Sequence, residues 1–381
     1  MGDDVVSNGE FLLPANLMEA YLAHKEDIDA AVHRVLDSGW YIGGAEVTAF
    51  EEEFAAFLGV PDAVGAASGT DALELAMRTL DIGPGDIVAT VSHTAVATVA
   101  AIELTGAVPV FVDIDPVTFT MCPECLQKTL EEDTENAIKA VIPVHLYGHP
   151  ADMPAICELA AAHGAAVIED CAQAHGAAIG DTKTGAWGAI GTFSFYPTKN
   201  LGALGDGGAI ATTQPALAQK AKLLREYGWE ERYISAVPGM NTRLDPIQAA
   251  ILRVRLAGLS ADNGLRRDIA SAYTKAFAGT SLCLPTEADQ AYHVYHQYVI
   301  RCDRRDELRG FLKEQNIGSL IHYPCPVHLQ PAYAQRIPLP PGGLPNTEKV
   351  CQDILSLPIY PEMGTANTDR VIDAVRLWLA G

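Results

Sequence analysis

The stretch AAVIED, residues 165–170, is an apolar run of strand length that ends in two acids. Similar runs come before and after it, separated by helix-like segments at 71–80, 95–105 and 153–163. Apolar strands that alternate with helices are typical of a mostly parallel sheet covered on both faces. The other predicted strands are AVGAA (63–67), IVAT (87–90), VPVFVD (108–113), AVIPVH (140–145), GTFSFY (191–196) and GGAIATT (207–213). The sequence therefore predicts an α/β fold.

A second, smaller unit is predicted after the sheet region. Its predicted elements are helices at 246–259 and 262–279, the strand HQYVIRC (296–302), a charged helix at 304–315 and a C-terminal helix. We therefore expect a large domain over residues 1–259 and a small α/β domain over 260–381, with a cleft between them.

The composition narrows the classes of protein. The chain has 26 Lys and Arg against 48 Asp and Glu, a formal net charge of −22, which disfavours binding to nucleic acid or to anionic membranes. The acidic N-terminus resembles no secretory signal. The charge-free apolar stretch at 87–102 is too short and too polar to span a bilayer. We expect a cytoplasmic protein.

The cysteines do not indicate a metal site. Of the eight, Cys122 and Cys125 form a CxxC pair, and no second pair stands at zinc-ligand spacing. A structural zinc site needs four ligands. We therefore expect no metal, and thiols that stay reduced.

Lys199 is the candidate nucleophile. It is the only charged residue between Thr184 and Gly205, in a segment of apolar and small residues. Burial in such surroundings lowers the pKa of an amine and makes it nucleophilic, which a Schiff-base lysine requires. A surface lysine in a glycine-rich loop would fit the same local pattern, so other features must decide.

Asp170 ends its predicted strand, and ligands of open α/β sheets bind where strands end. A pyridoxal cofactor needs a carboxylate at its ring nitrogen. Gln173 and His175 follow closely enough to reach ring substituents. The alternative for Asp170 is a helix N-cap.

A candidate phosphate site follows the first predicted strand. In ASGTDAL (67–73), Ser68, Gly69 and Thr70 would offer N–H groups and hydroxyls at a helix N-terminus, which attracts phosphate. The hydroxyl of Ser194 could add a second contact. An ordinary capped helix start is the alternative.

Taken in order, these segments resemble the DegT/DnrJ/EryC1/StrS family of aminotransferases. These are fold-type I pyridoxal 5′-phosphate (PLP) enzymes that act mainly on nucleotide-linked keto-sugars. The most specific part is VIEDCAQAHGA (167–177) followed by FSFYPTKNLGALGDGGAI (193–210). The resemblance covers nearly the whole chain and includes YIGG (41–44), SGTDALELAM (68–77), GMNTRLDPIQAAIL (239–252), HVYHQYVIR (293–301) and IHYPCPVHLQPAY (321–333).

The resemblance implies roles for these residues. Lys199 would hold PLP as a Schiff base and move the proton between Cα of the donor and C4′ of the cofactor. Asp170 would pair with the pyridinium nitrogen, and Gln173 would approach the ring hydroxyl. The donor would be L-glutamate, in a two-step ping-pong cycle.

The resemblance also implies a homodimer with shared active sites. The residues implied to hold the cofactor phosphate are Gly69, Thr70 and Ser194, together with Asn241, which would reach the phosphate of the neighbouring subunit. The family usually stacks an aromatic residue on the ring, in a T-aromatic-x-x-T pattern. Here the run is TAVAT (94–98), with Ala95 at the aromatic position. Either another side chain covers the ring, with His93 one candidate, or that face is left to the substrate. His93 could equally be a satisfied loop histidine.

By resemblance, the loops that carry Tyr41, His322, Tyr323 and His328 line the sugar and diphosphate site, although each could equally be a packed or solvated loop side chain. The pairing of HVYHQYVIR with IHYPCPVHL is closer to members that aminate a 3-keto-sugar, so we expect a nucleotide-linked 3-keto-6-deoxyhexose.

Several alternatives stay open. They are a 4-keto nucleotide-sugar, a keto-cyclitol of an aminoglycoside pathway, and a non-catalytic regulatory protein. Related pyridoxamine-dependent dehydratases have His in place of the Schiff-base lysine, so Lys199 argues against that chemistry. A dinucleotide-binding oxidoreductase would need a glycine fingerprint that the chain lacks.

Overall fold

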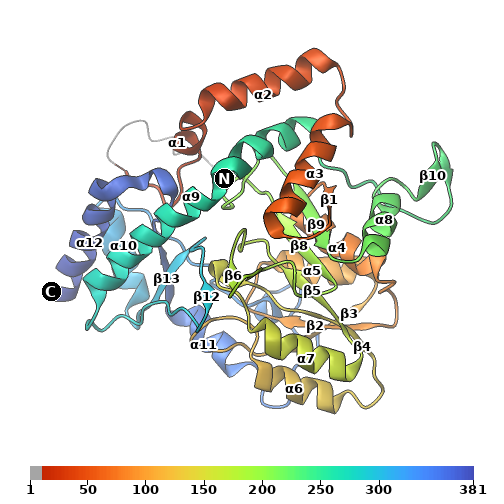
Figure 1. Ribbon diagram of the computed structural model, residues 1–381. Helices are drawn as coiled ribbons and strands as arrows, with labels where there is room; N and C mark the ends of the chain where they lie inside the picture. Colours follow the sequence, from red (N-terminus) through yellow and green to blue (C-terminus); the bar gives the residue numbers. More distant parts are fainter. Residues whose placement is uncertain (1–10) are drawn as a thin grey trace.

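The computed structural model describes residues 11–381, and its larger part is a seven-stranded sheet with helices on both faces (Figure 1). Across the sheet the strands are β1 (Asp62–Ala66), β9 (Gly208–Thr212), β8 (Ile190–Ser194), β5 (Ala166–Asp170), β4 (Ile138–Ile142), β2 (Ile87–Val91) and β3 (Val108–Val112). Within this sheet β9 runs antiparallel to both neighbours, and the other pairs are parallel. The predicted α/β fold with a mostly parallel sheet is confirmed.

Each face of the sheet has its own apolar core. One face is covered by α4 (Gly69–Thr79), α5 (Val96–Thr105) and α8 (Pro215–Leu224). The other is covered by α6 (Pro123–Glu132), α7 (Met153–His163), α3 (Ala45–Leu58) and the first half of α9 (Pro246–Phe277). In β5, Ile168 packs into the first core and Val167 into the second. Because both faces are buried, the strands read as continuous apolar runs.

Helix α9 is continuous over 32 residues, whereas the sequence predicts two helices with a break at 260–261. No proline stands there to interrupt the backbone hydrogen bonds. Asn263 favours caps and turns when its side chain bonds locally. Here that side chain instead contacts Asn200 and the carbonyl of His175, so it does not end the helix. The expected domain boundary between residues 259 and 260 lies inside α9.

A smaller unit packs against the second half of α9. It contains the antiparallel pair β13 (Tyr298–Arg301) and β14 (Ile354–Leu357), with α10 (Arg305–Glu314) and α12 (Gly364–Ala380). Leu12 pairs with Ile317 and lies in the same core, so the first described residues join the last part of the chain. Helices α1 (Leu17–Leu22) and α2 (Lys25–Ser38) then lead back over α9, as Figure 1 shows.

The remaining elements are short. They are β6 (Ala178–Ile179), β7 (Thr182–Lys183), β10 (Trp229–Glu231), β11 (Ile234–Ser235), β12 (Ala291–Tyr292), α11 (Pro345–Asp353) and the 3₁₀ turns Leu146–Gly148, Val327–Leu329 and Pro361–Met363. Among residues 11–381, no helix combines the length and the apolar character needed to cross a membrane.

Candidate active site

A cavity of about 340 Å³ opens at the sheet edge where β5 and β8 end and α4 begins. Its volume lies at the small end of the range for ligand sites. It brings together nine of the residues singled out from the sequence: Ser68, Gly69, Thr70, Asp170, Gln173, Ser194, Lys199, His322 and Tyr323. Carboxyl ends of parallel strands meet at one edge, which is why segments distant in sequence converge here.

Lys199 lies in the cavity wall, five residues beyond the end of β8. Burial lowers the pKa of its amine to about 8, and the negative charge of Asp170 opposes that shift only in part. More of this amine is therefore unprotonated near neutral pH than in an ordinary lysine. Such an amine can act as nucleophile or base.

Asp170 is buried at the end of β5. Its Oδ2 accepts a 2.9 Å hydrogen bond from the hydroxyl of Thr98, and its Oδ1 accepts a 3.1 Å bond from the N–H of Ala172. Burial raises the pKa of this carboxyl group, although both hydrogen bonds favour the ionised form. A carboxylate with two donors keeps lone pairs free for a cationic partner.

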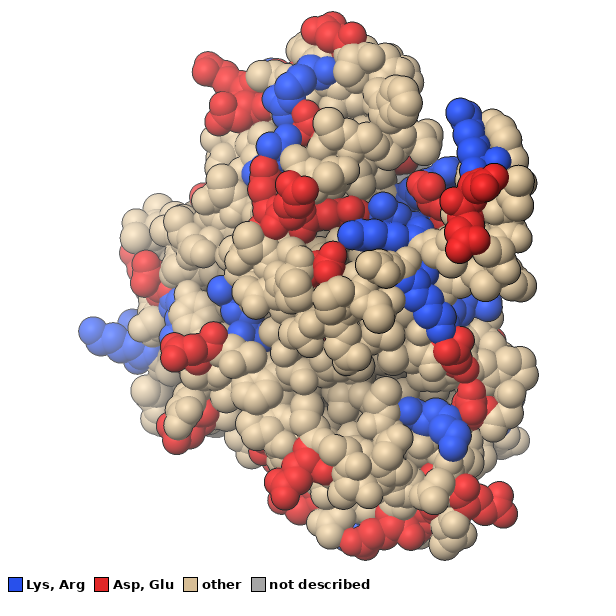
Figure 2. Space-filling view, turned by 45° about the vertical axis from the view of Figure 1, so that its right-hand side comes forward, with Lys and Arg blue, Asp and Glu red and all other residues tan. Residues whose placement is uncertain are grey.

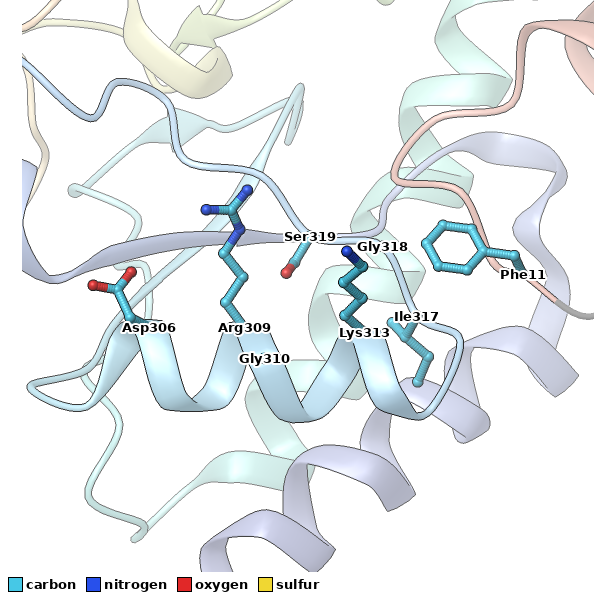
Figure 3. A pocket seen from close by; sticks show the side chains of 8 residues that line it. All are labelled: Phe11, Asp306, Arg309, Gly310, Lys313, Ile317, Gly318 and Ser319. Carbon is cyan, nitrogen blue, oxygen red and sulfur yellow. The ribbon is translucent and has the colours of Figure 1, made fainter. Parts of the chain in front are cut away.

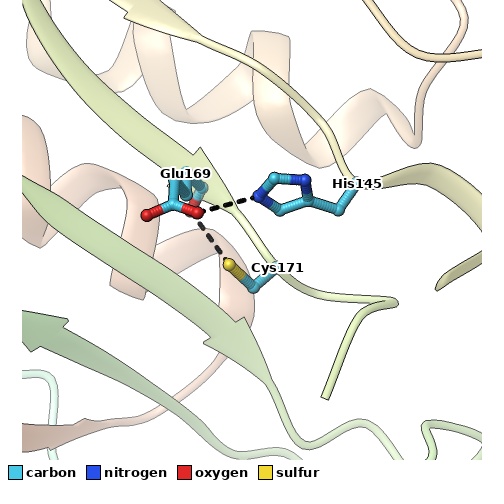
Figure 4. Close-up of side chains that lie close together, drawn as sticks. All are labelled: His145, Glu169 and Cys171. Carbon is cyan, nitrogen blue, oxygen red and sulfur yellow. Dashed lines mark hydrogen bonds and ion pairs between the residues drawn. The ribbon is translucent and has the colours of Figure 1, made fainter. Parts of the chain in front are cut away.

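The neighbouring acid, Glu169, is a structural clamp (Figure 4). Its carboxylate accepts four hydrogen bonds, from the N–H groups of Gly185, Trp187 and Gly188 and from Nε2 of His145. Nδ1 of His145 accepts the N–H of Ala151, so the ring proton sits on Nε2. Cys171 lies beside them, and the three side chains are close enough to be considered as metal ligands. The hydrogen bonds already use the lone pairs that a metal would need, and the absence of a metal stays a prediction.

The N-terminus of α4 forms the other end of the cavity. A Cβ on Gly69 would stand 2.5 Å from Cβ of Ser194, so only glycine lets the helix start approach β8 this closely. The first N–H groups of a helix have no acceptor within the helix, and they attract anions. The Ser68 hydroxyl accepts the N–H of Asp71, so this residue also caps the helix, as the alternative interpretation holds.

Gln173 connects the cavity floor to the small domain. Its Oε1 accepts the N–H of Tyr147 at 2.7 Å, and its Nε2 donates to the hydroxyl of Tyr323 at 3.1 Å. Burial raises the pKa of Tyr323 to about 12, so its hydroxyl keeps its proton. Burial lowers the pKa of His322 to about 4, so that ring is neutral at physiological pH.

His93 does not lie at the cavity. It has no exposed surface, and its Nε2 is 2.8 Å from the hydroxyl of Tyr147 while its Nδ1 is 3.4 Å from Sγ of Cys351. A side chain sealed in this way cannot cover a ring in the cavity, so the interpretation of His93 as a stacking residue is corrected. The methyl group of Ala95 lines the wall instead.

Three other predicted residues lie away from this cavity. His328 is buried and bonds through Nδ1 to Ser92 at 2.8 Å, and it does not line this cavity. Tyr41 is 51% exposed and donates its hydroxyl to the carbonyl of Leu36. Asn241 is exposed and forms a bridge with Glu226.

A larger hollow of about 580 Å³ lies on the small domain (Figure 3). Arg309 and Lys313 rise from α10 towards Ser319, and Phe11 faces them from the opposite side. None of the residues singled out from the sequence lines it. It is therefore not the candidate active site.

Residues 23–376 match the sequence profile of the DegT/DnrJ/EryC1/StrS aminotransferase family. The chain belongs to this family. One relative in Streptomyces venezuelae, named dTDP-3-amino-3,4,6-trideoxy-alpha-D-glucose transaminase, is 47% identical over 95% of both chains. Another, from Saccharopolyspora erythraea, is named erythromycin biosynthesis sensory transduction protein EryC1, and is 45% identical over 95% of this chain and 98% of its own.

A crystal structure of S. venezuelae DesV in complex with a ketimine intermediate superimposes with a TM-score of 0.94. The two chains are 46% identical, and the match covers 98% of this chain and 100% of DesV. Both the resemblance seen in the sequence and the predicted fold type are confirmed.

Aminotransferases of the DegT/DnrJ/EryC1/StrS family use PLP, and this chain is a PLP-dependent aminotransferase. The cavity fits that cofactor. Buried Asp170 lines the cavity with lone pairs left for a protonated ring nitrogen, and Lys199 supplies an amine of lowered pKa. The glycine at position 69 brings the first N–H groups of α4 to the other end, where they suit a phosphate.

Sequence reasoning missed several residues of this family member's site. Thr98 supports Asp170, and His296, Gln297, Tyr196 and Asp206 line the cavity. Signals for two of them were present, because Thr98 closes the TAVAT run and His296 lies in HVYHQYVIR. The fold was needed to show that they face the same cavity.

Proposed function

We propose that this aminotransferase moves an amino group from L-glutamate to a nucleotide-linked keto-sugar, with 3-keto-6-deoxyhexoses as the preferred class. The observation that carries the proposal is the placement of Lys199 and Asp170 in one cavity, beside a helix N-terminus. The name of the Streptomyces venezuelae relative, a 3-amino-sugar transaminase, supports position 3 of the sugar.

When bound, PLP supplies an aldehyde and an electron-withdrawing ring. Lys199 provides the amine that holds it and moves a proton at Cα of the donor. Asp170 keeps a positive charge on the ring nitrogen, because a buried carboxylate stabilises a cation next to it. Thr98 positions Asp170 through its hydrogen bond.

The opposite end of the cavity takes the phosphate. The residues that we assign to it are Ser68, Gly69, Thr70 and Ser194. The helix N-terminus contributes unsatisfied N–H groups and the positive end of its dipole. Gln173 is placed to reach a ring substituent, since its amide is held between Tyr147 and Tyr323.

His322 and Tyr323 face the remaining space and are proposed to contact the sugar. A neutral imidazole and a protonated phenol suit hydroxyl and carbonyl groups. Among residues 11–381, Lys199 is the one Lys or Arg side chain that lines this cavity. A substrate diphosphate therefore needs donors from outside it.

We propose that a second copy of the chain supplies those donors, in a homodimer with shared active sites. Tyr41 is assigned to the substrate of the neighbouring subunit and Asn241 to its cofactor phosphate, because each is exposed and does not line its own cavity. Exposed apolar side chains support such an interface: Trp40, Tyr41, Ile42, Tyr196, Leu204, Tyr233 and Ile234. Figure 2 shows one face where charged groups of both signs leave broad uncharged areas between them. A cytoplasmic location and the division into domains 1–259 and 260–381 complete the proposal.

The test is product analysis with purified holoenzyme, L-glutamate and a panel of nucleotide-linked 3-keto and 4-keto sugars and a keto-cyclitol. We expect amination of the 3-keto members. Borohydride reduction followed by peptide mapping should place the cofactor on Lys199. Lys199→Ala should abolish turnover, while Lys275→Ala, at an exposed site on α9, should not.

Other outcomes decide between the alternatives. Amination of only the 4-keto sugars or only the cyclitol would overturn the assigned substrate and keep the chemistry. A chain that binds PLP at Lys199 but aminates no member of the panel would favour a regulatory role, to which the name of the Saccharopolyspora relative points.

A further inference from the structure

A chain of buried side-chain amides runs from α9 to the wall of the active-site cavity. Nδ2 of Asn263 donates to the carbonyl of His175 at 2.8 Å, and Oδ1 of Asn263 accepts from Nδ2 of Asn200 at 2.8 Å. Asn200 directly follows Lys199 in the sequence. Its Nδ2 also donates to the carbonyl of Val294 at 3.1 Å. Each amide therefore has one backbone carbonyl that fixes which of its ends is the nitrogen.

The amide chain determines the protonation of His296. Oδ1 of Asn200 lies 3.1 Å from Nδ1 of His296, and an amide oxygen can only accept. Nδ1 of His296 must therefore carry the ring proton, which leaves a lone pair on Nε2 in the neutral ring.

Within residues 11–381 that lone pair has no hydrogen-bond partner. Both ring nitrogens of His175 are buried without a partner, whereas Nε2 of His296 is accessible to solvent. His296 is 5% exposed and lines the cavity together with Lys199. The open space beside Nε2 is therefore the active-site cavity.

The surroundings keep this imidazole neutral. Burial lowers its pKa well below the ordinary value, and nearby groups act in the same direction: Lys199, Arg266, His322 and His175. Arg266 is itself held by the carbonyls of Tyr295 and Ile359. In this position the neutral ring can accept a hydrogen bond from an N–H group without taking up its proton.

We propose that His296 is a positioning residue for Lys199, accepting at Nε2 a hydrogen bond from the Lys199 ammonium whenever that side chain is not linked to the cofactor. Both side chains line the same cavity, and the charge of Lys199 is close enough to help lower the pKa of His296. The bond holds the free amine beside the reacting atoms and raises its pKa relative to a site without the acceptor. The inference rests on Lys199 as the reacting amine, and not on the identity of the sugar.

The first test is the tautomer. In the full-length chain with ¹⁵N-labelled histidine, the resonances of His296 are those that disappear in His296→Gln. We expect Nδ1 protonated and Nε2 unprotonated, without protonation of the ring between pH 6 and 9, a window chosen around the ordinary histidine pKa of about 6.5. A proton on Nε2 would overturn the proposal.

The second test measures the pKa of Lys199 in the full-length chain without cofactor, from the pH dependence of its acylation read by peptide mass mapping. Wild type should give a midpoint below the ordinary lysine value of 10.5, because the amine is buried. His296→Leu removes the acceptor and should lower the midpoint by about one pH unit. His296→Gln keeps an acceptor and should stay near wild type. His33→Leu, at an exposed histidine of α2, is the matched control and should change nothing.

An unchanged midpoint in a folded His296→Leu protein would overturn the proposal. So would a rise in KM for the sugar with unaltered acylation, because His296 would then contact the substrate instead. The tautomer and the acylation midpoint are both measured without turnover. Loss of the acylation shift therefore refutes this inference, whereas failure of amination with the shift intact refutes the proposed function alone.

Discussion

The hydroxyl of Thr98 donates a 2.9 Å hydrogen bond to Oδ2 of Asp170, across 72 residues of sequence. Thr98 lies in the first turn of α5, and Asp170 is the last residue of β5. The bond favours the ionised carboxyl group against the effect of burial. The charge of this carboxyl group therefore depends on both residues.

Asp170→Asn should reduce kcat by a factor on the order of 10² to 10³, because a neutral amide cannot stabilise the charged ring nitrogen. Thr98→Val keeps the carboxylate and loses one donor, so we expect a smaller loss of about tenfold. Steady-state kinetics with matched circular dichroism spectra checks both. A Thr98→Val enzyme as impaired as Asp170→Asn would contradict the ranking.

Gly69→Ala should weaken cofactor binding by about tenfold or more. The added Cβ would meet Ser194 at 2.5 Å and push the helix start away from β8, with an overpacking cost of about 1–3 kcal/mol. Equilibrium dialysis of PLP gives the affinity. Gly264→Ala is the control, since nothing lies within 4 Å of its added Cβ, and in mid-helix it should stabilise the fold by about 0.5–1 kcal/mol. Equal affinity in both variants would contradict a role for the close approach at Gly69 in cofactor binding.

Lys199→Met should stabilise the cofactor-free chain relative to wild type most strongly below pH 8. The folded pKa of Lys199, about 8, lies below the ordinary value of 10.5, so the unfolded chain binds more protons between these values. Wild-type stability therefore rises with pH through that window, and the advantage of the variant shrinks. Thermal midpoints measured from pH 7 to 10 test this, and a constant difference would show that the amine is not desolvated.

Glu169→Gln should destabilise the fold by about 3 kcal/mol, measured as the free energy of unfolding in denaturant. The carboxylate accepts all four of its hydrogen bonds, and the NH₂ end of glutamine would face donors. Glu158→Gln, at an exposed site on α7, should change stability by less than about 0.5 kcal/mol. A similar change in the free energy of unfolding for the two variants would show that the hydrogen bonds of Glu169 do not stabilise the fold.

The sequence was sufficient for the sheet and for the centre of the site. Buried parallel strands such as β5 are apolar throughout, and the residues at their carboxyl ends necessarily lie at one edge. This is why Asp170, Lys199 and Gly69 could be placed in one cavity before the structure was known. Local patterns were also sufficient for the helix starts at α4 and α7.

What the sequence did not provide depends on pairing between distant segments. Nothing local distinguishes His93, which bonds to Tyr147, from His296, which lines the cavity. The clamp at Glu169 depends on N–H groups 16 to 19 residues away. The continuity of α9 likewise depends on Asn200. Its hydrogen bond to Asn263 keeps that side chain from bonding locally and ending the helix.

Helix α9 spans about 48 Å and contributes side chains to two hydrophobic cores, one in each domain. Leu252, Leu256 and Leu259 pack under the large sheet, while Ile269, Tyr273 and Phe277 fill the core beside β13 and β14. Cutting the chain near residue 259 would leave each fragment with half a helix and an uncovered apolar stripe. The large and small domains should therefore unfold together in a single calorimetric transition, and neither should be obtainable as an independent soluble fragment.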